Sequence, residues 1–153
     1  MKVLVDTNII IEYLGERQKA SQIERILRYC IQEQSKLYIS SGTLYTLAYL
    51  TERVLHNQGY TKPTLTDKQR KIFHTIIQLF NVVPIDSKNI LKGVDNEDFT
   101  DLEDSFQYQC AVMSDCEVLL TINYKDFQEV ASKGFVKILT PEDFIRQYVH
   151  ATK

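Results

Sequence analysis

Short apolar runs alternate along the chain with longer segments in which apolar residues recur every three or four positions. The short runs predict β-strands at residues 2–5, 37–39, 82–83, 117–120 and 136–138. The longer segments predict helices at residues 8–14, 19–34, 43–56, 67–80, 87–94 and 100–114, and a final helix after Thr140. Strands without polar alternation, each followed by a helix, are typical of a parallel sheet covered on both faces. We therefore predict one α/β domain over residues 1–153, with three α/β/α layers around a parallel five-stranded sheet.

Three patterns mark helix starts. Residues 66–69 and 100–103 each have the spacing of a capping box, with Thr first and Gln or Glu three residues later. Thr140 followed by Pro141 is typical of an N-cap and a first helical residue. The helix predicted from residue 100 repeats an apolar residue every four positions, which predicts its buried stripe. That stripe consists of Leu102, Phe106 and Cys110.

Composition and charge narrow the class of protein. With 44% hydrophobic and 25% charged residues, the chain is typical of a globular domain. The net charge of -2 provides no overall basic field, so a nucleic acid must be held by local cations or by a metal. Asp6 interrupts the first apolar run, no signal-peptide cleavage pattern follows, and no segment reaches the length of a membrane span. Cys30, Cys110 and Cys116 form no CxxC pattern, which predicts buried, reduced thiols in a cytoplasmic protein.

Three acids are predicted to converge at the carboxyl edge of the sheet. Asp6 directly follows the first strand, Asp126 lies in the turn after the fourth, and Asp104 lies in the first turn of the helix before it. Taken alone, Asp6 is better explained as an N-cap of the next helix. Three carboxylates together are an oxygen-only ligand set that suits Mg²⁺ or Mn²⁺. Such a metal polarises a phosphoryl oxygen and generates hydroxide from water.

Four further polar residues are candidate supports of this site, each with a structural alternative. Asn8 either fixes the Asp6 carboxylate or contacts metal through water. Thr121 either hydrogen-bonds Asp6 or substrate, or caps its turn, and Asn123 is either a neutral oxygen ligand or a turn residue. Glu103 is best explained by its place in the capping box, where its side chain would return to the backbone at residue 100.

A basic stretch is the candidate RNA-binding surface. It contains five cations against one acid, Asp67. The cations are Arg53, Lys62, Lys68, Arg70 and Lys71. A solvated loop and helix face explains them at least as well, and a salt-dependent affinity for RNA would separate the two interpretations.

Four motifs in order along the chain resemble those of PIN-domain proteins. They are residues 3–8 (VLVDTN), 102–105 (LEDS), 119–127 (LLTINYKDF) and 138–144 (ILTPEDF). The resemblance implies a metal-dependent ribonuclease with a five-stranded parallel sheet, and many bacterial members resemble VapC-type toxins paired with an antitoxin. It also implies that Asp6, Asp104 and either Asp126 or Asn123 are the metal-site positions. The expected partners are RNA, an antitoxin protein and, for self-association, a second copy of the chain.

Two positions depart from the family pattern. Thr46 stands where a Glu is usual, and Glu52 is six residues too late to replace it. Ile122 replaces the Arg of the closing motif, and Asn123 takes a position often held by Asp. These losses of charge keep open a second hypothesis, a weakened or inactive PIN-like module that binds RNA or protein. A flavodoxin-like phosphatase or phosphoacceptor ranks lower, because Lys125 lies in a turn and not on a late strand.

Overall fold

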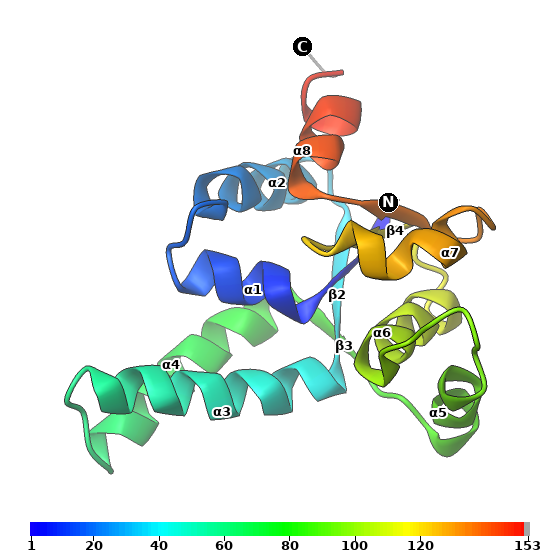
Figure 1. Ribbon diagram of the computed structural model, residues 1–153. Coiled ribbons are helices and arrows are strands. Elements are labelled where there is room, and N and C mark those ends of the chain that lie inside the picture. Colours follow the sequence, from blue (N-terminus) through cyan, green and yellow to red (C-terminus); the bar gives the residue numbers. More distant parts are fainter. Residues whose placement is uncertain (152–153) are drawn as a thin grey trace.

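The computed structural model describes residues 1–151 and contains a five-stranded, fully parallel sheet (Figure 1). The strand order is β3-β2-β1-β4-β5, so β1 lies at the centre. The strands are β1 Lys2–Val5, β2 Lys36–Ser40, β3 Asn81–Val83, β4 Val118–Leu120 and β5 Lys137–Leu139. Val3 of β1 is opposite Leu37 of β2 and Val118 of β4. The predicted sheet is confirmed, with strand bounds that differ by at most one residue.

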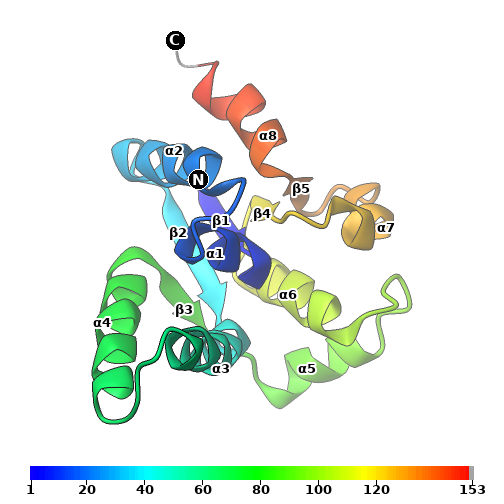
Figure 2. The same ribbon diagram turned by 60° about the vertical axis from the view of Figure 1, so that its left-hand side comes forward.

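Helices cover both faces of this sheet. The helices are α1 Thr7–Leu14, α2 Ala20–Gln32, α3 Ser41–Asn57, α4 Thr64–Leu79, α5 Ser87–Val94, α6 Leu102–Met113, α7 Gln128–Ala131 and α8 Pro141–Phe144. A short 3-10 helix, η1, spans Tyr124–Phe127, and a π-helical turn, η2, spans Ile145–Val149. Figures 1 and 2 show α1, α2 and α4 on one side of the sheet and α5, α6 and α7 on the other. The three-layer α/β/α prediction is therefore confirmed.

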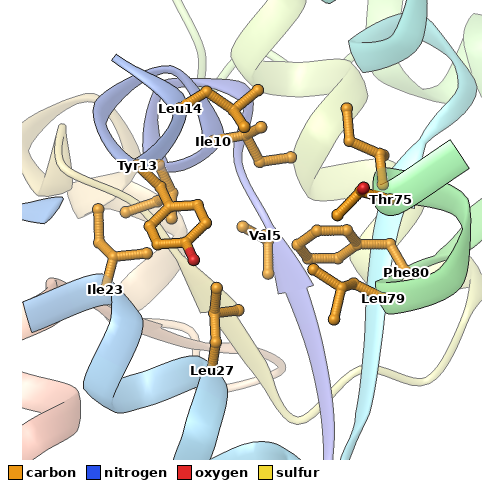
Figure 3. Close-up of a pocket in the computed structure, with 11 residues that line it drawn as sticks. Val5, Ile10, Tyr13, Leu14, Ile23, Leu27, Thr75, Leu79 and Phe80 are labelled. Atoms are coloured by element: carbon orange, nitrogen blue, oxygen red, sulfur yellow. The ribbon is translucent and has the colours of Figure 1, made fainter. Parts of the chain in front are cut away.

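Side-chain alternation along β1 explains the two layers of core. Val3 and Val5 pack into the cluster formed with α1, α2 and α4, whereas Leu4 packs into the cluster formed with α6 and α7. All three side chains are completely buried, as expected for a central strand with both faces covered. Figure 3 shows a cavity of about 30 Å³ beside Val5, with Leu27 and Phe80 among its walls. Its lining is almost entirely aliphatic and aromatic, so it is a packing void of the core.

Both predicted capping boxes are wrong, whereas the predicted α8 start is confirmed. The α6 helix begins at Leu102, and its N-cap is Asp101, whose side chain accepts a hydrogen bond from the Asp104 N–H at 3.2 Å. Thr100 is therefore not the cap, and Glu103 stands at the second helical position and not the third. The reason is that Asp caps as well as Thr, so adjacent cap-competent residues leave the register open. At α8, Thr140 accepts from the Asp143 N–H at 3.2 Å.

The α4 helix starts three residues earlier than predicted, at Thr64. Its N-cap position is Pro63, and the Leu65 side chain is buried in the first turn. The Gln69 side chain donates to the Ala48 carbonyl at 2.9 Å and to the Thr51 hydroxyl at 3.0 Å. Gln69 thus joins α4 to α3 instead of returning to its own helix start.

The predicted apolar stripe of α6 is wrong at its first member. Leu102 is 53% exposed, whereas polar residues further along the helix are buried. These buried polar groups have partners: Ser105 donates to the Gly93 carbonyl at 2.6 Å, and Gln109 donates to the Asn89 side chain at 2.8 Å. Hydrophobic periodicity fails here because hydrogen bonds, not apolar contacts, satisfy one face of the helix.

Two further predictions concern the cysteines and the membrane. Cys30, Cys110 and Cys116 are buried thiols, and burial raises the pKa of each to about 11, which keeps them protonated and unreactive. Among the helices within residues 1–151, none is both long and apolar enough to cross a membrane.

Candidate active site

Asp6 lies where β1 ends and α1 begins. Its backbone N–H donates to the Leu120 carbonyl at 3.0 Å, which extends the contact between β1 and β4 by one residue. Its side chain is the N-cap of α1 and accepts from the Thr7 N–H at 2.8 Å. The capping interpretation of Asp6 is therefore correct. It does not account for the second carboxylate oxygen or for the other donors that meet this residue.

Four donors converge on the Asp6 carboxylate, which is only 4% exposed. Oδ1 accepts from the Thr7 N–H at 2.8 Å and from Gln107 Nε2 at 3.2 Å. Oδ2 accepts from Thr121 Oγ1 at 2.8 Å and from Asn8 Nδ2 at 3.1 Å. All four donors are uncharged. Burial raises the pKa of Asp6, and these hydrogen bonds lower it without cancelling the effect of burial.

Gln107 is the member of this network that sequence reasoning missed. It is 3% exposed, and its Nε2 also lies 3.0 Å from Thr7 Oγ1 and 3.1 Å from Thr43 Oγ1. It therefore links α6 to the start of α1 and to the first turn of α3. The available signal was its spacing, because a residue three positions after Asp104 lies on the same face of the helix.

The orientation of the Gln107 amide follows from the charge of its neighbour. Turning the amide over would place Oε1 against the Asp6 carboxylate, so Nε2 must face Asp6. Oε1 is then left buried, with no hydrogen-bond partner within residues 1–151. Leaving a buried carbonyl unpaired costs about 1–3 kcal/mol. The hydrogen bond from Gln107 Nε2 to Asp6 is therefore formed although it leaves Oε1 unpaired.

Asp104 and its neighbours form a second, more open group of acids. The pKa of Asp104 is raised to about 7, first by burial and then by the negative charges of Asp101, Asp6, Asp126 and Glu103, in that order of importance. The pKa of Glu103 is also raised, first by burial and then by Asp6 and Asp101. Each of these charges is therefore near enough to repel its neighbours.

The closing turn contributes its residues unevenly. Thr121 is completely buried, and its Oγ1 accepts from the Asn123 N–H at 3.1 Å in addition to donating to Asp6. Asn123 and Asp126 are exposed, just before and within η1, where the Asp126 N–H donates to the Asn123 carbonyl at 3.0 Å. Asn8 Oδ1 accepts from the Ile122 N–H at 3.2 Å, which ties this turn to α1. The metal-binding and catalytic roles of these residues stay predictions.

The donor set fits a hard divalent cation that keeps much of its water. Within residues 1–151, no group of three or more His, Cys, Asp or Glu side chains is arranged to hold a metal ion. Mg²⁺ needs only one or two carboxylates when water and a substrate phosphate complete its shell. Asp6 and Asp104 would supply such a pair, and a cation would relieve the like-charge repulsion that, after burial, raises the pKa of Asp104.

Thr46 lies beside this group of acids. Together with Glu103, Phe106 and Gln107, it lines a cavity of about 230 Å³ between α3 and α6. Its hydroxyl donates to the Gly42 carbonyl of its own helix at 3.4 Å. A longer acidic side chain at this position would share the cavity with Glu103.

The predicted RNA-binding cations lie at the other end of α3. Arg53 is ten residues after Thr43, or about 15 Å along the helix. Figure 1 shows the turn between α3 and α4 far from α6. Two cations are paired there, Lys62 with Glu52 at 3.4 Å and Arg70 with Asp67 at 2.6 Å. Arg53 lies over the Tyr49 ring, Lys68 lies over the Tyr60 ring, and Lys71 is exposed.

Comparisons with known proteins identify the family and the fold of this chain. A family model described as PIN domain matches residues 2–125. Ribonuclease VapC1 of Aquifex aeolicus (strain VF5) is 24% identical over 152 residues, covering 96% of this chain and 95% of that protein. A crystal structure of VapBC2 from Rickettsia felis, bound to a DNA fragment from their promoter, has a similar fold. Its TM-score is 0.68 at 14% identity, covering 92% of this chain and 98% of that one. With the family match spanning most of its length, the chain belongs to the PIN domain family.

Proposed function

We propose that this protein is a VapC-like endoribonuclease that uses Mg²⁺ or Mn²⁺ to hydrolyse phosphodiester bonds of RNA in the cytoplasm. The observation that carries the proposal is the Asp6 carboxylate, which four uncharged donors hold beside a second acid, Asp104. The similarity of this chain to a ribonuclease, along nearly the full length of both proteins, supports the same reaction.

The residues would divide the chemistry between them. A bound divalent metal supplies Lewis acidity toward a phosphoryl oxygen and acidifies water. Asp6 and Asp104 would hold that cation, and Asn8, Thr121 and Gln107 would keep the Asp6 carboxylate in one orientation. The two exposed residues of the closing turn, Asn123 and Asp126, would orient the attacking water. Without a cation, the pKa of Asp104 is about 7, so its carboxyl exchanges a proton near neutral pH.

The test is cleavage of single-stranded RNA at increasing Mn²⁺ or Mg²⁺. We expect Asp6→Asn and Asp104→Asn each to lower the rate by about 100-fold or more, the scale for removing one group that stabilises transition-state charge. Asp115→Asn is the matched control, because Asp115 is an exposed acid just after α6 with a positive φ of 54° that Asn tolerates. Equal cleavage by wild type and both active-site variants would mean that a contaminating nuclease is responsible.

A second candidate function is an RNA- or protein-binding module with a weakened or inactive site. Thr46 favours it, because a threonine hydroxyl bonded to its own helix replaces an acid in the cavity beside Glu103. Calorimetric titration of Mn²⁺ into wild type and Thr46→Glu separates the two candidates. An active but under-charged site predicts tighter binding and faster cleavage in the variant. Unchanged metal binding in Thr46→Glu, together with no cleavage by wild type, favours the binding module.

We also propose that the ribonuclease is the toxin of a toxin–antitoxin pair. The support is a fold neighbour solved as a VapBC2 complex on promoter DNA. Induced expression in a bacterial host should then arrest growth, and Asp104→Asn at equal protein level should not. Metal-dependent cleavage in vitro without growth arrest would leave the ribonuclease in place and contradict its role as a toxin.

A further inference from the structure

Helix α3 exposes two large aromatic side chains on one face. Tyr45 is 82% exposed and Tyr49 is 61% exposed, and residues four apart lie one above the other on a helix. The opposite face packs into the protein through Thr43, Leu47 and Leu55. Two neighbouring exposed rings on one helix face are a candidate binding surface.

This aromatic face joins two hollows of the protein surface. At its first turn is the cavity beside the candidate active site, which Thr46, Glu103 and Gln107 line. At its other end is an open hollow that Tyr49, Arg53, His56 and Lys62 line. Thr46 and Tyr49 are three residues apart, so one continuous helix face leads from the candidate active site to the second hollow.

The second hollow combines hydrogen-bond donors and cations with an aromatic ring, which suits an anion that also carries flat rings. Arg53, His56 and Lys62 can donate hydrogen bonds, and the carboxylate of the lining, Glu52, already pairs with Lys62 at 3.4 Å. The Arg53 guanidinium lies 5.7 Å from the centroid of the Tyr49 ring, so cation and aromatic face are presented together. Exposed rings interleaved with cations are typical of surfaces that bind single-stranded nucleic acid.

We infer that single-stranded RNA lies along the exposed face of α3. Bases stack on Tyr45 and Tyr49, and phosphates lie in the hollow of Arg53, His56 and Lys62. The strand reaches the candidate active site through the cavity beside Thr46. The identity of the substrate rests on the proposed function, whereas the path along α3 rests on the exposure and charge of these residues.

Binding without cleavage tests the path. The probe is a fluorescein-labelled, 2′-O-methyl, mixed-sequence 12-mer titrated in EDTA and followed by anisotropy. Tyr45→Ala and Tyr49→Ala should each weaken binding by about fivefold or more, as expected for loss of one stacked base. Tyr45→Phe and Tyr49→Phe keep the rings and should bind like wild type. Phe135→Ala is the control, because Phe135 is 77% exposed but lies far along the chain, after α7. A fully paired duplex of the same sequence should compete poorly, because its bases are not free to stack.

The phosphate contacts have their own signature. Arg53→Ala should reduce the slope of log affinity against log salt by about 1, the loss of one phosphate contact. Arg28→Ala is the matched control, because Arg28 is an exposed arginine of α2 that pairs with Glu24 away from α3.

Two outcomes overturn the path along α3. One is a wild type that does not bind the probe, or alanine variants that bind it as tightly as wild type. The other is that Tyr45→Ala and Tyr49→Ala dissociate a dimer in sedimentation and leave RNA binding unchanged. That result would make this face a protein–protein interface. Because the assay needs no metal, a protein that binds RNA through these tyrosines but never cleaves it refutes the ribonuclease and leaves the path intact.

Discussion

The two acids at the centre of the site are held in opposite ways. Asp6 is buried, and each of its carboxylate oxygens accepts two hydrogen bonds from uncharged donors. Asp104 is partly exposed, and partial burial together with the surrounding like charges raises its pKa to about 7. The first arrangement fixes the orientation of the Asp6 carboxylate. The second leaves negative charges around Asp104 that a cation would neutralise. We call Asp6 and its four donors the floor of the site, and Asp104 with the neighbouring acids its rim. The floor is held rigidly, whereas the rim responds to nearby charge.

Removing the floor should have the largest effect on stability. Asp6→Ala leaves the Thr121 hydroxyl and the Gln107 and Asn8 amides without their acceptor. Relief of a buried charge offsets part of this loss, so we expect about 2 kcal/mol of destabilisation in urea unfolding. Asp126→Ala, an exposed acid of the rim, should change stability by less than about 0.5 kcal/mol. Equal effects of the two changes would remove the distinction between floor and rim.

The support of Asp6 by Gln107 should matter more for cleavage than for stability. We expect Gln107→Leu to slow metal-dependent cleavage by about tenfold, the usual scale for a residue that orients a ligand. Gln109→Leu removes another buried amide from the same helix, one that bonds Asn89 and not Asp6. If both substitutions slow cleavage equally, Gln107 acts only through helix stability.

The rim should make stability depend on pH. In the folded state, the pKa of Asp104 is raised from 3.8 to about 7, so the folded protein holds a proton that the unfolded chain has lost between those values. Stability in EDTA should therefore fall as pH rises from about 5 to 8. Asp104→Asn should flatten this decline and gain roughly 1 kcal/mol at pH 8, after solvent screening of a partly exposed group is allowed for. Urea unfolding at both pH values is the measurement, and Asp115→Asn should keep the wild-type decline.

The smallest effect is expected at the three cations of α4, of which Arg70 is already paired with an acid. Replacing Lys68, Arg70 and Lys71 by alanine should leave folding nearly unchanged and lower the salt slope of RNA binding by about 1–2. The reduction stays below three because Arg70 is held by Asp67 at 2.6 Å. An unchanged slope would assign these residues to a solvated surface.

The sheet could be predicted from the sequence because its signal is local. Strands buried on both faces read as apolar runs, and parallel topology then places the residue after β1 and the turn after β4 at one edge. Asp6, Thr121 and Asn8 were identified in this way, and the structure joins all three through hydrogen bonds.

The parts that could not be predicted depend on partners distant in the sequence. Gln107 looks like any helical glutamine until Thr43, 64 residues earlier, and Asp6, 101 residues earlier, are brought beside it. Apolar spacing alone predicts a buried Leu102, which is in fact exposed. The buried positions of α6 instead hold polar residues such as Ser105, whose partner lies on α5. Hydrogen bonds between separate helices and strands leave no periodic pattern in the sequence from which they could be predicted.

The most direct test of the account is a double-mutant cycle on RNA cleavage at saturating Mn²⁺. It compares wild type, Asp6→Asn, Asp104→Asn and the double variant. If floor and rim act on one cation and one phosphate, the double variant should lose little more than the worse single variant. Losses that multiply independently, or no loss in either single variant, would contradict a shared site.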